Sequence, residues 1–197
     1  MDAAASLLRE ARLLGFLGPG PLAPQVAHAL AYVSATTLVD PALVVDLGSG
    51  GGLPALVLLA NGYGRRWVLV ERSRTRADWL QRAVHRLAVA DRVEVRCESA
   101  EAVARSELRG TVDLVTARSF APLSVTAEVA APFLREGGEL VASLDANQLV
   151  PTDVAALQMS FERIHVGSHL FCRGRPLALA PGSLPRSWRA MQRSPLF

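Results

Sequence analysis

Lysine is absent from the sequence, and all 21 of its Lys/Arg positions are arginine. No mechanism that requires a lysine amine can operate in this chain. Cysteine is nearly absent too: Cys97 and Cys172 stand alone, without a CxxC pattern or a His-rich neighbour. Two isolated cysteines are typical of reduced, structural thiols, and the sequence therefore predicts no metal site.

Long hydrophobic runs are also missing, although half of the 197 residues are apolar. The longest apolar stretches, such as residues 53–60, are far too short to cross a bilayer. Arg9, Glu10 and Arg12 interrupt the apolar residues near the N-terminus, which is unlike a signal peptide. We expect a cytoplasmic protein with no membrane partner, folded around a well-buried core.

The most informative stretch is residues 44–54, which read VVDLGSGGGLP. An apolar strand runs through Asp46 into a turn, and a proline then starts a helix. The turn carries glycine at alternate positions, namely Gly48, Gly50 and Gly52. Without Cβ atoms the backbone can turn tightly and a ligand can lie against it, as in the loops that bind nucleotide-type cofactors.

The spacing of this motif also indicates which cofactor binds. A dinucleotide-binding G-x-G-x-x-G pattern needs a glycine at position 53, where the chain has Leu53. Asp46 lies two residues before the first glycine, and its carboxylate weakens a phosphate site but suits a cationic ligand. S-adenosylmethionine carries an ammonium and a sulfonium and no phosphate. The motif therefore predicts S-adenosylmethionine as the cofactor, with a nicotinamide enzyme as the least favoured alternative.

Glu71 supports this interpretation. It ends the apolar run 67–70 and stands 19 residues after Gly52, where an acid at the end of a second strand accepts hydrogen bonds from ribose hydroxyls. The alternative is a glycine-rich turn with two incidental acids. We favour the cofactor site because the turn and both acids agree.

From residue 42 the pattern alternates between strand, turn and helix, which predicts a Rossmann-like α/β fold with a mainly parallel sheet and helices on both faces. The expected strands are residues 43–46, 67–71, 92–97, 112–116 and 139–143, and the helices between them are 53–61, 75–90, 100–106 and 123–134. Ligands of such sheets bind at the carboxyl ends of the strands. Two helices, at 3–14 and 25–36, precede the sheet, and the apolar runs 161–166 and 176–179 predict a C-terminal antiparallel hairpin on its edge.

Charge is distributed unevenly along the chain. Residues 1–60 carry two arginines against four acids, a net charge of −2, whereas residues 163–197 contain six arginines and no acid. Such a basic segment favours a polyanionic partner, because phosphate contacts dominate non-specific affinity for nucleic acid. A solvated basic tail explains the charge equally well.

Further motifs add a resemblance to a known family. They are Gly-Leu-Pro at 52–54, Thr75-Arg76 and Trp79-Leu80 after Glu71, Ser-Ala-Glu at 99–101, Ala-Arg-Ser-Phe-Ala at 117–121, Pro185-Arg186, and Ser194-Pro195-Leu196. In this combination, over residues 25–145 and the tail, the chain resembles the small-subunit ribosomal RNA guanine-N7 methyltransferases, also called the glucose-inhibited-division B family. The resemblance implies a class I S-adenosylmethionine-dependent methyltransferase domain at 41–197 behind an N-terminal helical segment at 1–40. It implies an enzyme that methylates a guanine of ribosomal RNA in the small ribosomal subunit, and we expect a monomer.

The resemblance also implies roles for residues at the strand ends. Asp46 and the backbone of residues 48–53 are expected to hold the methionine moiety of the cofactor. Glu71 is expected to bind its ribose, and Ala100 with Glu101 its adenine. No catalytic side chain is assigned, because guanine N7 carries a free lone pair and methyl transfer to it needs no deprotonation.

Three residues are candidates for contact with the acceptor. Arg118 is expected to bridge cofactor and guanine, with a strand-end ion pair as the alternative. His28 stands 18 residues before the acid of the glycine loop, as does the histidine of the family's His-x-x-Asp-Ser element, and its alternative is a helix histidine satisfied by backbone. Arg186 belongs to the basic tail. For Phe120 and Trp188, stacking on a flipped base competes with core packing.

The chain also departs from this family. Residues 1–45 contain neither Trp nor Asn, where the family carries Trp-Asn and Asn-Leu-Thr elements in a longer N-terminal region. Ala31-Tyr32 replaces the family's Asp-Ser, and Ser143-Leu144-Asp145 replaces Leu-Lys-Gly. Two alternatives therefore remain open: a methyltransferase that acts on a small molecule or another RNA, and a cofactor-binding module without catalytic activity.

Overall fold

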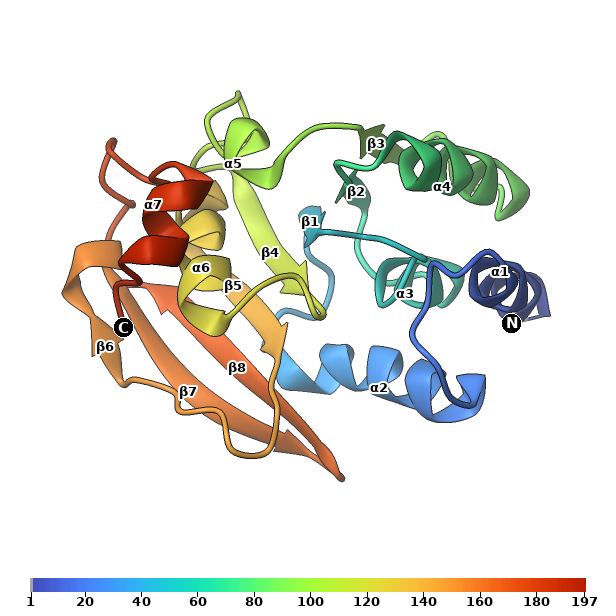
Figure 1. Cartoon of the computed structure of the whole chain (residues 1–197), viewed down its shortest axis with the longest axis horizontal. Coiled ribbons are helices and arrows are strands. Elements are labelled where there is room, and N and C mark those ends of the chain that lie inside the picture. Colours follow the sequence, from blue (N-terminus) through green and yellow to red (C-terminus); the bar gives the residue numbers. More distant parts are fainter. Residues whose placement is uncertain (1) are drawn as a thin grey trace.

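One eight-stranded sheet organises the chain, with the strand order β3-β2-β1-β4-β5-β8-β7-β6 (Figure 1). In the computed structural model, which describes residues 2–197, the first five strands run parallel and the last three are antiparallel. The parallel strands are β1 (Leu43–Leu47), β2 (Arg66–Val70), β3 (Val93–Arg96), β4 (Val112–Ala117) and β5 (Leu134–Ser143). The others are β6 (Asp153–Val154), β7 (Met159–Val166) and β8 (His169–Pro176). This confirms the mainly parallel α/β fold.

Helices cover both faces of this sheet. They are α1 (Asp2–Leu13), α2 (Leu22–Ala35), α3 (Ala55–Ala60), α4 (Arg74–Arg86), α5 (Ala100–Val103), α6 (Leu123–Ala130) and α7 (Trp188–Arg193). Two 3-10 turns, Ala131–Phe133 and Ala155–Leu157, complete the set within residues 2–197. The helix expected to run to residue 134 ends at 130, because Pro132 follows and β5 already begins at Leu134.

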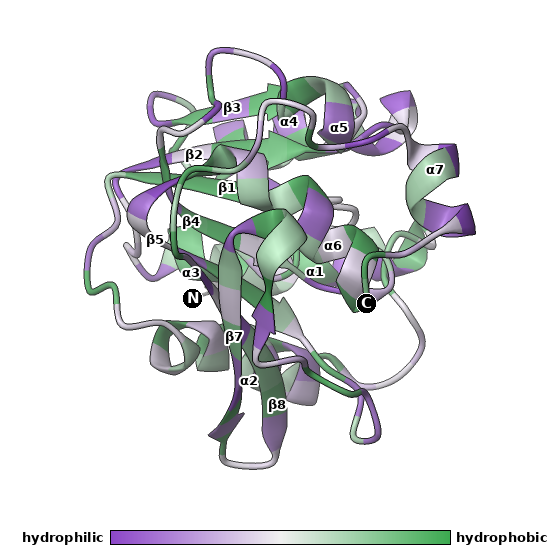
Figure 2. Ribbon diagram, turned by 90° about the vertical axis from the view of Figure 1, so that its left-hand side faces the viewer, coloured by the Kyte–Doolittle hydropathy of each residue, from purple (hydrophilic) through white to green (hydrophobic). Residues whose placement is uncertain are grey.

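Strand alternation divides the core between the two faces. Val44 packs with residues of α1 to α4, whereas its neighbour Val45 packs with residues of α5 and α6. All six residues of β4 are buried; four of them are apolar, and the two polar ones, Asp113 and Thr116, are hydrogen-bonded. In Figure 2 the central strands carry mainly the hydrophobic colour, as expected for strands buried between two layers of helices. Within residues 2–197, no helix is both long and apolar enough to span a membrane.

The antiparallel hairpin is present at the sheet edge, but its second strand was misplaced by the sequence prediction. β8 covers residues 169–176 rather than 176–179, and Val166 pairs with His169 across a two-residue connection. Gly167 has φ +57°, the left-handed conformation that such tight hairpin turns require. Leu177 and Leu179, counted as strand residues for their apolarity, lie beyond β8 and are exposed.

The N-terminal helices are tied to the sheet by hydrogen bonds and by shared core. The Tyr32 hydroxyl donates to the Ala117 carbonyl at 2.8 Å, at the end of β4. The buried Glu139 of β5 accepts from the Thr36 hydroxyl at 2.6 Å and from the Thr37 amide at 2.9 Å. The first bond holds α2 at the carboxyl end of β4, and the other two tie the residues after α2 to β5. The division into residues 1–40 and 41–197 and the monomeric state both stay predictions.

Candidate functional site

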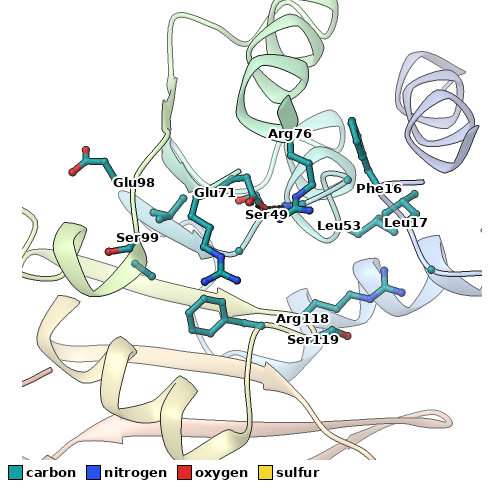
Figure 3. Close-up of a pocket in the computed structure, with 18 of the residues that line it drawn as sticks. Phe16, Leu17, Ser49, Leu53, Glu71, Arg76, Glu98, Ser99, Arg118 and Ser119 are labelled. Carbon is teal, nitrogen blue, oxygen red and sulfur yellow. Dashed lines mark hydrogen bonds and ion pairs between the residues drawn. The ribbon is translucent and has the colours of Figure 1, made fainter. Parts of the chain in front are cut away.

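A cavity of about 470 Å³ lies at the carboxyl ends of the parallel strands (Figure 3). This volume is typical of sites for small molecules and cofactors. Its lining comes from the loop before α2, the glycine loop, the end of β2, the start of α5, the end of β4 and α7. Seven of the residues predicted from sequence line it, namely Gly48, Gly50, Leu53, Glu71, Ala100, Glu101 and Arg118.

The glycine loop forms the floor of this cavity. Gly48 and Gly50 have φ of +65° and +53°, in the region that side chains rarely adopt. A Cβ atom on Gly48 would lie only 2.8 Å from the Phe120 ring. Gly52, with φ +87°, lies outside the cavity, where a Cβ would collide with Leu56 of α3. The first two glycines therefore keep the floor open, and the third allows α3 to pack.

Asp46 lies in β1 beneath the glycine loop and is almost fully buried. Its Oδ1 accepts a hydrogen bond from the Thr116 hydroxyl at 2.7 Å, whereas its buried Oδ2 has no partner among residues 2–197. Burial raises the pKa of Asp46 to about 7, against the opposing effect of the Thr116 hydrogen bond. An unpartnered buried carboxylate oxygen is costly, so a cationic or hydrogen-bonding ligand beside Asp46 would stabilise its charged form.

Glu71 directly follows β2 and is an ionised acceptor on the cavity wall. Its Oε2 accepts from the Gly50 amide at 3.0 Å, and its Oε1 accepts from the Ser73 amide at 2.7 Å and from the Arg76 guanidinium at 2.8 Å. Burial favours a higher pKa for Glu71, but these bonds outweigh it and hold the pKa below its usual value. Glu71 thus fixes the glycine loop to the end of β2, and its Oε2 keeps a lone pair for a further donor.

The loop after β3 supplies a second wall. Ser99 caps α5, with its hydroxyl oxygen accepting from the Ala102 amide at 3.4 Å. Ala100 is buried and Glu101 is half-buried, and both line the cavity together with Glu98. This wall therefore offers a ligand the apolar surface of Ala100 and the carboxylates of Glu98 and Glu101.

Arg118 follows β4 and supplies a cation. Its Nη2 donates to the Gln25 side chain at 3.2 Å, and its buried Nη1 has no partner within the described part of the chain. Burial lowers the pKa of Arg118, while the nearby Asp46 and Tyr32 oppose that effect; an arginine still remains protonated at neutral pH. No carboxylate among residues 2–197 pairs with it, so the structure does not support the alternative of a strand-end ion pair.

His28 lies outside the cavity, against aromatic rings. Its ring centroid is 5.0 Å from that of His169, 5.1 Å from Phe171 and 5.6 Å from Tyr32. Its Nδ1 is buried without a partner in residues 2–197, so the alternative of a ring satisfied by backbone is not seen for this atom. Burial, reinforced by Arg118 and His169, lowers the pKa of His28 to about 4. The position of this neutral ring does not support direct contact with a ligand in the cavity.

Arg186 also lies outside the cavity. Its Nε and Nη2 donate to the two oxygens of the buried Glu128 carboxylate, at 2.8 and 2.6 Å. The two N–H donors with which a guanidinium binds a phosphate are therefore already occupied by Glu128. The prediction of substrate contact from Arg186 is therefore not supported by its position.

Comparison with known proteins identifies the family. The family model described as GidB, rRNA small subunit methyltransferase G, matches residues 24–175. The chain belongs to this family.

Curated relatives and solved structures agree with this assignment. The "Ribosomal RNA small subunit methyltransferase G" proteins of Clavibacter sepedonicus and Leifsonia xyli subsp. xyli are each 34% identical to this chain. The first alignment covers 78% of this chain and 70% of the relative, and the second 79% and 73%. A methyltransferase from Geobacter sulfurreducens has a TM-score of 0.61 at 17% identity, and the cofactor-bound Rv0187 from MTB has 0.65 at 21%, each covering 89% of both chains. These two likenesses confirm the Rossmann-like methyltransferase fold.

The site of this GidB-family chain also contains residues that sequence reasoning missed. Phe16 and Leu17, in the loop between α1 and α2, enter the cavity from the side opposite to Glu98 and Ser99 (Figure 3). Gln25 of α2 lines the cavity as well and holds the Arg118 guanidinium. In the sequence, residues 15–24 are rich in glycine and proline. This composition predicts a loop, but it does not predict the surface on which the loop packs.

Gly51 provides a test of this contact between the N-terminal loop and the GidB-family glycine loop. A Cβ on Gly51 would lie 2.5 Å from Leu17 Cδ2 and 2.8 Å from the Phe16 carbonyl oxygen. Gly51→Ala is expected to displace that loop and to lower the free energy of unfolding by about 1 kcal/mol, the lower end for overpacking. Thermal unfolding measures the loss. Gly182→Ala is the control, because Gly182 faces open space and, like Gly51, has no left-handed φ; equal losses from both variants would contradict the close packing at Gly51.

Proposed function

We propose that this chain uses S-adenosylmethionine to methylate N7 of a guanine in small-subunit ribosomal RNA. The observation that carries the proposal is the unpartnered Oδ2 of the buried Asp46, beneath a glycine loop that forms the cavity floor. A phosphate-bearing dinucleotide does not suit that carboxylate. The family assignment supplies the acceptor class, since relatives of this chain are named for the small ribosomal subunit.

The residues of the cavity fit this cofactor. Asp46 and the loop of residues 48–53 offer a carboxylate and close backbone approach to its cationic amino-acid part. Glu71 has a free lone pair for a ribose hydroxyl, and the buried Ala100 with Glu101 offers an apolar surface and an acceptor to the adenine. When bound, S-adenosylmethionine supplies an electrophilic methyl group on its sulfonium.

The chain's own contribution to the reaction is binding and orientation. Guanine N7 has an unshared electron pair, so no side chain has to remove a proton, and the missing lysine is not required. Holding donor and acceptor in line can lower the barrier by roughly 7 to 11 kcal/mol. Arg118 has a free Nη1 on the β4 side of the cavity, where its cation is available to orient the acceptor.

A labelled-methyl assay tests this function. The purified protein is incubated with methyl-labelled S-adenosylmethionine and three acceptors: naked small-subunit ribosomal RNA, assembled small subunits, and a cell extract that supplies other RNAs and small molecules. Nucleosides from the RNA are then resolved by mass spectrometry. We expect N7-methylguanosine from at least one of the two ribosomal acceptors.

Other outcomes contradict the proposal in distinct ways. Label in another RNA, in another base or in a small molecule would show a methyltransferase with a different acceptor. Calorimetric binding of S-adenosylmethionine with no transfer to any acceptor would show a binding module without activity. Binding of NADH in place of S-adenosylmethionine would overturn the cofactor assignment itself.

A further inference from the structure

The C-terminal tail, residues 180–197, is held against the body of the molecule by arginines from outside it. The Arg109 guanidinium donates to the carbonyls of Leu184 at 2.8 Å, Pro181 at 2.7 Å and Ala180 at 3.0 Å. Arg105 donates to a further tail carbonyl, that of Pro185. Backbone carbonyls held in this way fix the course of the tail before α7 begins.

A buried ion pair fixes α7 itself. Glu128 of α6 is 1% exposed, and besides the Arg186 guanidinium it accepts from the Arg186 amide at 2.9 Å. The same guanidinium donates to the carbonyl of Ser194 at 2.9 Å, directly after α7. Arg186 therefore joins both ends of α7 to α6, and Figure 1 shows these two helices side by side.

This arrangement brings one aromatic residue of the tail to the cavity. Trp188, the first residue of α7, lines it together with Phe120. The two rings meet edge to face, with centroids 5.8 Å apart and an interplanar angle of 77°. Trp188 is half-buried, whereas Trp67 and Trp79 are each 1% exposed. An aromatic pair with remaining exposed surface at a cavity is suited to stacking on a planar ligand.

The strand order places this aromatic pair away from the expected ribose and adenine. Glu71 follows β2 and Ala100 follows β3, both on one side of β1. Phe120 follows β4, on the other side of β1, and its ring lies over Gly48 at the end of β1. The aromatic pair is therefore on the side of the cavity where the methionine end of the cofactor and the acceptor meet.

We propose that Trp188 and Phe120 form an aromatic wall that stacks on the purine base of the acceptor and positions it, an inference that rests on the proposed function. Arg189 and Arg193 extend the same helix with exposed side chains, and neither pairs with a carboxylate in the described residues. Since a polynucleotide base is flanked by phosphates, a cationic helix beside the aromatic wall suits an RNA acceptor.

Tryptophan emission tests this wall without relying on turnover. The probes are guanosine monophosphate, a short single-stranded RNA with one guanosine, and S-adenosylhomocysteine. The other two tryptophans are buried, so an added ligand changes mainly the emission of Trp188. We expect the first two probes to quench this emission saturably. We expect S-adenosylhomocysteine to leave it nearly unchanged, because its ribose and adenine are expected on the other side of β1. Quenching by S-adenosylhomocysteine but not by guanosine monophosphate would place Trp188 on the cofactor's purine and overturn the proposal.

Two variants separate stacking from packing. Trp188→Leu keeps apolar bulk and is expected to weaken RNA binding roughly fivefold or more, the low end for base stacking, while cofactor affinity is unchanged. Trp188→Phe keeps an aromatic face and is expected to restore most of that affinity. Equal RNA affinity in wild type and Trp188→Leu would overturn the wall while leaving the proposed methyl transfer intact. Saturable quenching without any methyl transfer to ribosomal RNA would support the wall and contradict the proposed function.

The phosphate contact has its own matched control. Arg189→Gln is expected to reduce the slope of log affinity against log salt by about 0.7, the value for one contact to single-stranded RNA. Arg66→Gln removes the same charge from the exposed amino end of β2, the end of the strand opposite the cavity, and is expected to leave the slope unchanged. Equal slopes in the two variants would show that α7 does not face the RNA.

Discussion

Asp46→Asn is expected to weaken S-adenosylmethionine binding by about 1.5 to 3 kcal/mol, the range for a hydrogen bond to a charged group. This corresponds to a loss of roughly 10- to 150-fold in affinity. The variant keeps the size of the side chain and an acceptor for the Thr116 hydroxyl but removes the negative charge under the glycine loop. Isothermal calorimetry measures the loss, and wild-type affinity in this variant would overturn the role of Asp46.

The control for Asp46→Asn is Thr116→Val, which removes the hydrogen-bond donor and keeps the charge. It is expected to raise the pKa of Asp46 further, because the Thr116 hydroxyl stabilises the carboxylate. At pH 8.5, where a larger share of Asp46 is charged in both proteins, Thr116→Val is expected to bind the cofactor more tightly than Asp46→Asn. A loss as large as that of Asp46→Asn would assign the effect to packing rather than charge.

The pKa of about 7 for Asp46 gives this binding a pH dependence. A cation binds the charged form better, so affinity is expected to rise between pH 6 and pH 8 with release of a proton. The effect on stability has the opposite sign. Because the folded pKa lies above the ordinary value of 3.8, the folded state holds a proton that the unfolded state has released, and stability without ligand falls as pH rises from about 4 to 7. Calorimetry in buffers of different ionisation enthalpy measures the released proton, and Asp46→Asn is expected to abolish it.

Arg186→Met is expected to lower the free energy of unfolding by about 3 kcal/mol, since it leaves the buried Glu128 charge without its partner. For a chain of this size that is a fall of roughly 6–12 °C in melting temperature. Limited proteolysis is expected to cut within residues 180–197 earlier than in wild type, because Arg186 joins both ends of α7 to α6.

The double variant Glu128→Gln with Arg186→Met tests whether the unpaired charge causes this loss. Glutamine removes the charge and keeps an acceptor for the Arg186-position amide, so the double variant is expected to recover most of the stability. If the double variant melts as low as the single one, the loss comes from packing of the arginine side chain instead.

The part of the site that sequence predicts well is local in the chain. Gly48, Gly50 and Leu53 of the cavity lining lie within six consecutive residues, and the glycine spacing alone dictates a turn with open backbone at the end of a strand. Asp46 is buried beneath this turn and is not part of the lining, so its contact with the cofactor stays a prediction. Glu71 was found because parallel strands bring their carboxyl ends to one edge. The same rule correctly placed Arg118 at the cavity.

What sequence did not predict depends on contacts between distant segments. Phe16 and Leu17 reach the cavity only because their loop packs on Gly51. Arg186 looked like a free tail cation, but its partner Glu128 is 58 residues away in the chain. The second hairpin strand lies at 169–176 rather than 176–179, because the tight turn at Gly167 and Ser168 starts it and pairing with β7 outweighs the apolarity of residues 177–179. In each case tertiary packing, rather than local propensity, decided the outcome.

The arginine-held tail also sets an order of events during protein synthesis. Trp188 is translated after every other residue that lines the cavity, the next latest being Phe120. The glycine loop, Asp46, Glu71 and Arg118 therefore emerge before the ring that completes the aromatic wall. The aromatic wall therefore cannot be complete until residue 188 has been synthesised and α7 has packed against α6.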